Sequence, residues 1–289
     1  ESFYTESAGR KVWLSPRDVK VERDAKGRAL SAIDIKTGLP VHSGGITKMS
    51  KSKNNGIDPQ TTIDKYGADT VRLFTMFAAP PEQTLEWSDE GVSGAYRFLR
   101  KLWKMVHDHL RLNSADPLNV GSLNETQKDL RRKTHETIGK VNDDYGRRNT
   151  FNTAIAAVME LLNDIAKLNE SDAQSIAVRH EALTCAILLL SPVAPHICHS
   201  LWATLGNSES VADASWPVVD ESALVRMTIT LVLQVNGKVR GKIEVSADIS
   251  KQDIEEIALQ DANVQRFIEG FTIRKIIIVP GRLINIVAN

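Results

Sequence analysis

The sequence predicts a multidomain, mainly α protein with a β-rich module at its start and a small α/β domain at its end. Three observations predict this class. Short β-like segments alternate with turn residues over residues 1–45, long amphipathic patterns fill residues 89–205, and strand patterns return after residue 222. With 289 residues, 42% of them hydrophobic, the chain can form more than one core, so two or three domains are expected.

Composition limits where the protein acts and what it binds. The 36 Lys and Arg residues balance the 36 Asp and Glu residues, so a polyanionic partner would have to bind local basic patches. Cys185 and Cys198 lie in apolar helical patterns, which favours the reducing cytoplasm over a disulfide scaffold. No apolar run approaches the roughly 20 residues that cross a bilayer, so no membrane partner is expected. The first residue is Glu1 and not Met, which suggests a piece of a longer protein.

Residues 1–45 predict a small, mostly exposed β module. Strands are expected at residues 11–14, 19–21 and 32–35, because turn residues such as Ser15-Pro16 separate these β-like segments. A surface insertion without chemistry is sufficient to explain most of this module.

Residues 46–84 predict a loop followed by two short helices. The loop is expected to be mobile, because Gly44-Gly45 and Asn54-Asn55-Gly56 place flexible residues on both sides of a lysine-rich stretch. Asp58 followed by Pro59 predicts a helix start, since the carboxylate can cap free N–H groups and the proline needs no donor there. Gly67 is expected to end this helix.

The second short helix is expected over residues 68–77, before Pro80-Pro81. Its buried side chains are predicted to be Val71, Phe74 and Phe77.

Residues 85–206 predict a bundle of about five amphipathic helices. The first helix has apolar residues at three-and-four spacing and basic residues largely on its other faces. Its apolar positions are Val92, Ala95, Tyr96, Leu99, Leu102, Trp103, Val106 and Leu110. Trp87, Trp103 and Trp202 are expected to be core anchors and not base-stacking platforms.

Residues 206–220, rich in Ser, Asn and Ala, predict a linker to a separate α/β domain at residues 222–289. Hairpin strands are expected around Asn236-Gly237, followed by a helix over residues 251–260 and two further strands.

The hairpin register can be argued from its apolar pattern. A two-residue turn would split the apolar side chains between the two faces, so a three-residue loop with a left-handed Gly237 is expected. The buried face would then hold Leu231, Leu233, Val239 and Ile243. The solvent face would carry a basic stripe of Lys238, Arg240 and Lys242.

The most specific motif is Lys48-Met49-Ser50-Lys51-Ser52, which matches the signature loop of class I aminoacyl-tRNA synthetases letter for letter. Spacing alone fits a solvated basic loop equally well. The resemblance implies that these five residues bind ATP and that Lys48 and Lys51 are catalytic. Their ammonium groups would stabilise the pyrophosphate that leaves when an amino-acid carboxylate attacks ATP, each by a few kcal/mol at most. Loop mobility would allow closure and product release.

The sequence around this motif resembles leucyl-tRNA synthetases of the bacterial type. The similar segments are Lys53-Asn54-Asn55-Gly56-Ile57-Asp58-Pro59, Tyr66-Gly67-Ala68-Asp69-Thr70-Val71-Arg72-Leu73-Phe74, Ala78-Ala79-Pro80-Pro81, residues 151–160, Ser191-Pro192-Val193-Ala194-Pro195-His196, and residues 234–242.

This resemblance assigns the expected parts of the chain. Residues 1–45 would be the leucine-specific insertion module, and residues 46–84 would be the signature-loop and stem-contact remnant of the catalytic fold. Residues 85–206 would be the anticodon-binding domain, and residues 222–289 a C-terminal domain that contacts tRNA.

One departure from the family affects activity. The second signature of the complete enzyme, His-x-Gly-His, matches none of the seven histidines, and the editing domain and amino-acid pocket are missing. The isolated chain is therefore predicted not to activate leucine.

The resemblance also suggests which basic side chains contact tRNA phosphates. The candidates are Arg97, Arg100, Lys104, Arg147, Arg148, Lys238, Arg240 and Lys242. A solvated helix face explains each bundle candidate equally well. A metal site at His196, Cys198 and His199 is disfavoured, because these side chains would not all face one point.

The resulting expectation is a part of a leucine-tRNA ligase, which activates leucine with ATP and transfers it to tRNA(Leu). ATP with Mg²⁺ would serve the complete enzyme, with no cofactor bound by protein ligands in this chain, and the protein would be a cytoplasmic monomer. One alternative is that the isolated piece is a noncatalytic tRNA-binding module. Another is a ligase for isoleucine or valine, which the insertion ahead of the signature loop and the C-terminal hairpin domain disfavour.

Overall fold

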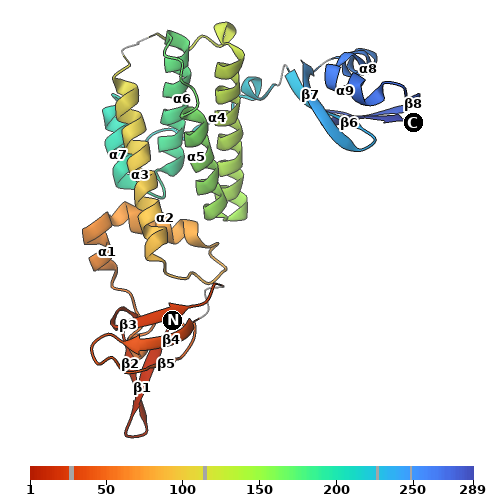
Figure 1. Ribbon diagram of the computed structural model, residues 1–289. Coiled ribbons are helices and arrows are strands. Elements are labelled where there is room, and N and C mark those ends of the chain that lie inside the picture. The colour runs from red at the N-terminus through yellow and green to blue at the C-terminus, as the bar shows by residue number, and fades with distance from the viewer. Residues whose placement is uncertain (26–28, 113–115, 226–227, 248) are drawn as a thin grey trace.

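The structure is a computed structural model that describes residues 1–25, 29–112, 116–225, 228–247 and 249–289. Strands gather near the N-terminus, a helical bundle lies in the centre, and a second α/β group carries the C-terminus (Figure 1). Mixed helix and strand content with a helical centre agrees with the predicted fold class.

The N-terminal module consists of two small antiparallel sheets around a core of Phe3, Val19, Ala32 and Val41. One sheet has the order β2-β1-β5 and the other pairs β3 with β4. The strands are β1 (Phe3–Ser7), β2 (Arg10–Leu14), β3 (Val19–Arg23), β4 (Ala29–Asp34) and β5 (His42–Ser43). The three expected strands are present as β2, β3 and β4, and β1 and β5 are additional.

Two short helices connect this module to the bundle, α1 (Pro59–Tyr66) and α2 (Ala68–Ala78). The Asp58 carboxylate accepts a hydrogen bond from the Gln60 N–H at 3.0 Å, so the expected helix cap is present. Gly67 separates the helices with a φ of 85°, which glycine adopts without strain. Phe74 is buried, but Phe77 in the last turn of α2 is 38% exposed, so its predicted burial is wrong.

Five helices form the bundle, as expected: α3 (Asp89–Leu110), α4 (Glu125–Asp143), α5 (Phe151–Ile165), α6 (Ala173–Leu190) and α7 (Pro195–Thr204). The buried side chains of the five helices form one hydrophobic core, which also includes Leu73 and Phe74 from α2 and Val211 from the segment after α7. Trp202 is buried in this core, but Trp103 is 40% exposed and is not a core anchor. By length and composition α6 could cross a membrane, yet most of it is buried against its neighbours as a core helix of the bundle.

The segment after the bundle is not the free linker that its composition suggested. Val211 is buried in the bundle core, and the Trp216 indole donates to the Asn142 amide oxygen at 2.5 Å. The segment continues into a short 3₁₀ helix, η5 (Glu221–Leu224), which packs against α4. The segment is irregular because it is rich in small polar residues, and its few apolar side chains pack against the bundle helices.

The C-terminal domain has a four-stranded sheet in the order β7-β6-β9-β8, with β6 and β9 parallel. Helices α8 and α9 contribute Ile254, Ala258 and Val264 to a core with the inward side chains of the sheet. The elements are β6 (Thr228–Val235), β7 (Lys238–Ser246), α8 (Lys251–Gln260), α9 (Ala262–Ile268), β8 (Ile273–Val279) and β9 (Leu283–Ala288). The expected strands and the helix at residues 251–260 are present, and α9 is additional.

The predicted three-residue hairpin loop is wrong. Val235 pairs directly with Lys238, and Asn236 and Gly237 both have positive φ, 49° and 76°, which is the two-residue turn typical of Asn-Gly. Leu233 faces Gly241 while Gln234 faces Val239, so Arg240 is an extra residue, a β-bulge.

This bulge restores the apolar register that a simple two-residue hairpin would have lost. Ile243 faces Leu231 and packs against the core as expected. Val239 is 61% exposed, because it lies beyond the bulge, and its predicted burial is wrong.

Candidate functional site

The signature loop is an ordered turn and not an extended chain. Ser50 begins a short 3₁₀ helix, η2 (Lys51–Lys53), and its hydroxyl oxygen accepts from the Lys53 N–H at 3.3 Å. Asn54 ends η2 with a φ of 49°, a left-handed conformation that asparagine tolerates better than most residues. Ser50 and Ser52 hydroxyls lie 3.2 Å apart.

Asn55, expected to be a flexible flanking residue, is 3% exposed. Its Oδ1 accepts from the Ser50 N–H at 2.8 Å. Its Nδ2 donates to Thr47 Oγ1 at 3.3 Å and to the Lys48 carbonyl at 3.4 Å. Sequence reasoning missed this role, because the same residue type is common in both flexible and hydrogen-bonded turns.

Lys48 and Lys51, the two predicted catalytic residues, are both exposed. Within the described part of the chain neither ammonium group has a hydrogen bond or ion pair with protein. Their charge is therefore available to an anion, in contrast to most cations discussed below. Met49 is 44% exposed, so the five residues expected to bind ATP lie together at an open surface.

The β module touches this loop through Trp13. The Lys53 ammonium lies 5.6 Å from the centre of the Trp13 ring. Before the loop, Ser2 donates its N–H to the Gly45 carbonyl at 3.0 Å and accepts from the Gly44 N–H at 2.8 Å. Ser2 is fully buried, so this N-terminal side of the loop is pinned to the module.

After the loop, α2 is tied to the bundle by two side chains that sequence reasoning assigned no role. The Asp69 carboxylate accepts from the Ile197 N–H at 2.7 Å and lies 2.8 Å from His196 Nδ1, at the start of α7. Arg72 donates to the Val193 carbonyl at 3.0 Å and to the Pro192 carbonyl at 2.9 Å. The signature loop is thus connected to the bundle through short, hydrogen-bonded elements.

Among the candidates on α3, two keep an uncompensated charge. Arg97 and Arg100 are exposed, and the part of the chain that is described offers neither of them an ion-pair partner. Arg100 lies 5.9 Å from the Tyr96 ring centre. Lys104 is paired with Asp108, one turn further along α3.

Arg147 and Arg148 lie in a π-helical turn (Asp144–Arg148) after α4. Arg147 donates two hydrogen bonds to Asp143, at 2.5 and 2.9 Å. Hydrogen bonding to Arg147 holds the pKa of Asp143 below its usual value. Arg148 lies 3.3 Å from the fully buried Asp144. Each arginine therefore has a carboxylate partner in its own turn, and Asp144 is shared between Arg148 and Lys140.

The basic stripe predicted on the C-terminal hairpin is not formed. Lys238 pairs with Val235 and Lys242 with Val232, and these two partners point to opposite faces of β6. Arg240 in the bulge lies 3.5 Å from the centre of the Phe267 ring on α9. The three cations therefore do not share one face, because the bulge shifts the alternation by one residue.

The disfavoured metal site at His196, Cys198 and His199 is not assembled in the structure. Among the described residues no group of three or more metal-ligating side chains comes together. His196 pairs with Asp69, and Cys198 is buried away from the surface. His109 is buried and its Nε2 lies 3.2 Å from His180 Nδ1 on α6.

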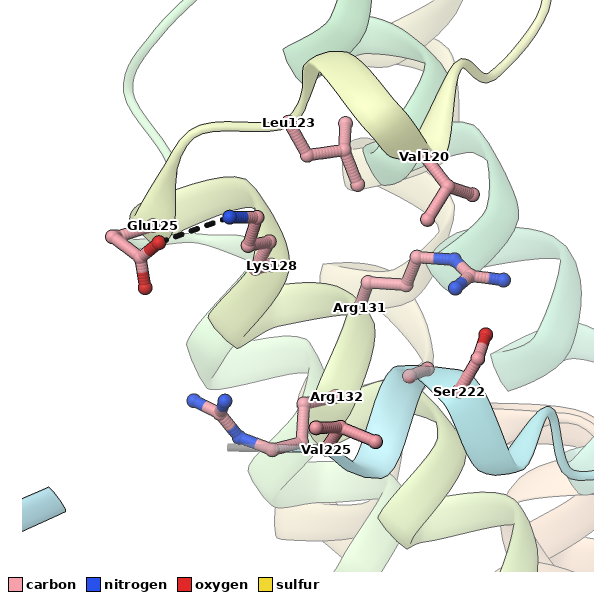
Figure 2. Close-up of a pocket in the computed structure, with 9 residues that line it drawn as sticks. Val120, Leu123, Glu125, Lys128, Arg131, Arg132, Ser222 and Val225 are labelled. Carbon is pink, nitrogen blue, oxygen red and sulfur yellow. Dashed lines mark hydrogen bonds and ion pairs between the residues drawn. The ribbon is translucent and has the colours of Figure 1, made fainter. Parts of the chain in front are cut away.

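A pocket of about 320 Å³ opens between the start of α4 and η5. Figure 2 shows Arg131 and Arg132 from α4, with Val120 and Leu123 before it and Ser222 and Val225 from the other side. Each cation in it has a carboxylate partner: Lys128 pairs with Glu125, Arg132 with Asp129, and Arg131 with Glu181 and Asp220. The pocket is therefore a junction between the bundle and the following segment, with little free charge for an anion.

Two segments of the chain match known protein families. Residues 35–88, which include the signature loop, match the family described as tRNA synthetases class I (I, L, M and V). Residues 127–256 match the anticodon-binding domain of tRNA ligase.

Individual relatives cover the whole chain. It is 62% identical over 290 aligned residues to the leucine-tRNA ligase of Marinobacter nauticus and 59% identical to that of Cellvibrio japonicus, in each case over 100% of this chain and 34% of the relative. The chain thus spans about a third of the length of the curated relatives it matches.

A solved structure has a similar fold. It is the ternary complex of Agrobacterium radiobacter K84 agnB2 LeuRS with tRNA and LeuAMS, with a TM-score of 0.70 and 28% identity, covering 84% of this chain and 32% of that one. Over its whole length the chain is therefore similar to about one third of a leucine-tRNA ligase, and two of its segments match family models of class I tRNA synthetases and of their anticodon-binding domain.

Proposed function

We propose that this chain is the C-terminal part of a leucine-tRNA ligase and that it supplies the pyrophosphate-side cations and the tRNA-binding surfaces of the complete enzyme. The observation that carries the proposal is that Lys48 and Lys51 are exposed on an ordered loop of the matching motif and have no ion-pair partner among the residues that the structure describes. Leucine is favoured over isoleucine or valine because the two relatives compared above, which match the whole chain, are leucine-tRNA ligases.

The chemistry follows from charge. When the leucine carboxylate attacks the α-phosphorus of ATP, the bond to pyrophosphate breaks and negative charge grows on the departing oxygens. Ammonium groups without carboxylate partners stabilise that charge more strongly in the transition state than in the ground state. Mg²⁺ would arrive bound to the ATP phosphates, because this ion prefers oxygen ligands.

The tRNA-binding role rests on different residues. Arg97 and Arg100 are the strongest candidates for phosphate contacts, because no described residue forms an ion pair with either of them. Lys238 and Lys242 remain candidates on the hairpin, although they lie on opposite faces of the sheet. We place the protein in the cytoplasm as a monomer.

The experiment compares two forms. The complete protein that carries this chain should catalyse leucine-dependent ATP–pyrophosphate exchange, and changing Lys48 or Lys51 to Ala should reduce it by about 100-fold or more. The isolated 289-residue chain should be inactive. Undiminished exchange in either lysine variant would contradict the assigned role.

A noncatalytic tRNA-binding module is the second proposal for the isolated chain. It is favoured by the match to an anticodon-binding domain over residues 127–256. Binding of tRNA(Leu) by the isolated chain, without any pyrophosphate exchange, would support it.

A further inference from the structure

Asn55 is a buried amide beside an exposed loop, and within the described residues its side chain forms hydrogen bonds only to positions 47–50. The Oδ1 atom accepts from the Ser50 N–H at 2.8 Å, while Nδ2 faces Thr47 Oγ1 at 3.3 Å and the Lys48 carbonyl at 3.4 Å. A buried carboxamide whose donors and acceptor are all used constrains the backbone that it bridges.

These bonds close a ring from Thr47 to Asn55, and the two lysines project from it. Asn55 touches the carbonyl of Lys48 itself and the N–H of Ser50, the residue directly before Lys51. The Ser50 hydroxyl continues the arrangement by capping η2. The backbone positions of both lysines therefore depend on one side chain.

We infer that Asn55 is a positioning residue: it holds the backbones of Lys48 and Lys51 at a fixed separation, so that the loop moves as one preformed unit. The inference rests on the proposed function of the two lysines, through which Asn55 acts. A unit that is already folded loses less conformational freedom when it closes over a substrate, and it presents both charges together.

The unit has a fixed boundary on its N-terminal side. Ser2 and Gly45 are joined by a backbone hydrogen bond of 3.0 Å, and a second bond joins Ser2 to Gly44. Motion of the preformed loop would therefore pivot after Gly45 and not within the residues that carry the lysines.

Asn55→Ala tests the inference, with Asn54→Gly as the matched control. Asn54 is the neighbouring exposed asparagine, its side chain has no hydrogen bond among the described residues, and its φ of 49° suits glycine. In the complete protein, Asn55→Ala should lower kcat for leucine-dependent pyrophosphate exchange about 30- to 100-fold, with a smaller rise in KM for ATP. Asn54→Gly should stay within about threefold of the parent.

A second measurement does not depend on catalysis. In the 289-residue chain, exchange of the Ser50 amide hydrogen followed by NMR should be slow in the parent and in Asn54→Gly, and fast in Asn55→Ala. Asn55→Asp keeps the acceptor for Ser50 but loses the donor to Lys48, so it should protect the Ser50 amide and show an intermediate kcat.

The outcomes distinguish the positioning role of Asn55 from the proposed function of the two lysines. If Asn55→Ala leaves either kcat or Ser50 exchange at the parent value, the positioning role is wrong. If Lys48→Ala is inactive while Asn55→Ala is active, the proposed function stands without it. If Lys48→Ala is active, the proposed function itself fails. If Asn55→Ala does not fold, Asn55→Asp decides by its kcat, which must be lower than that of Asn54→Gly.

Discussion

Arg131 on α4 and Asp220 in the segment after the bundle are joined by a hydrogen-bonded ion pair, with Nη2 and Oδ2 2.7 Å apart. The same guanidinium lies 3.2 Å from Glu181 on α6, and the Arg131 side chain is only 7% exposed. One buried cation therefore links two bundle helices to the chain that leads into the C-terminal domain.

Removing this cation should destabilise the bundle. Arg131→Met would leave two carboxylates without their buried partner, and the free energy of unfolding should fall by about 3 kcal/mol. Arg132→Met is the control, because Arg132 pairs with an Asp129 that is 62% exposed and its loss should cost less than about 1 kcal/mol. Urea denaturation measures both, and equal midpoints for the two variants would argue against the linking role of Arg131.

Stability should fall in mild acid because of His109. Burial, together with the nearby His180 and Arg179, lowers the pKa of His109 to about 4. The unfolded chain, with a pKa near 6.5, binds the proton first, so this contribution to stability is present above about pH 6.5 and is lost as the pH falls toward 4. The loss should be at most about 3 kcal/mol.

His109→Gln should flatten the pH dependence of unfolding between pH 6.5 and 4, whereas the exposed His199→Gln should leave it unchanged. The free energy of unfolding, measured at several pH values, checks this. A slope that His109→Gln does not alter would mean that another group controls the acid transition.

Free and paired arginines should differ in their effect on tRNA binding. Arg97→Ala removes an uncompensated charge, whereas Arg147→Ala removes one that already pairs with Asp143 at 2.5 Å. Arg97→Ala should therefore weaken tRNA binding by the complete protein and reduce its salt slope by about one. Arg147→Ala, with the same formal charge change, should have a smaller effect. A larger effect of Arg147→Ala would show that the ion pair opens on binding.

Gly44→Ala should loosen the attachment of the signature loop. A Cβ at this position would lie 2.6 Å from Ser2 Oγ and 3.1 Å from the Trp13 ring. The methyl group must displace a fully buried serine, at a cost of about 1–2 kcal/mol. Gly56→Ala on the other side of the loop is the control, since no atom of a described residue lies within 4 Å of a Cβ added there. Faster exchange of the Ser2 amide hydrogen in Gly44→Ala alone would confirm the attachment.

Sequence patterns predicted those parts of the fold that depend on residue type at short range. The cap at Asp58, the stop at Gly67 and the five amphipathic helices follow from local preferences and periodicity. The hairpin was different, because two solutions preserve the apolar faces, a longer loop or a bulge. The chain uses the bulge at Arg240, and the isolated strand glycine beside it, Gly241, is a residue type typical of bulges that does not by itself exclude the longer loop.

The candidate site was likewise predicted only in part from the sequence. The motif marked Lys48 and Lys51, but the clamp of Asn55 depends on where a side-chain amide points, which periodicity does not specify. The compensation of Arg147 by Asp143 was visible in principle as a four-residue spacing on a helix. Asp69 and Arg72 make contacts more than 100 residues away in the chain, and no local pattern predicts such partners.

The docking of residues 207–220 on the bundle decides where the protein can be shortened. A form that ends at Gly206 would lose the buried Val211, the indole bond to Asn142 and Asp220, one of the two carboxylate partners of Arg131, although every bundle helix would be retained. A form that ends at Val225 would keep all three. The natural edge of the helical unit is therefore about 20 residues beyond its last helix, and a trimmed version that respects it should remain monodisperse where the shorter one aggregates.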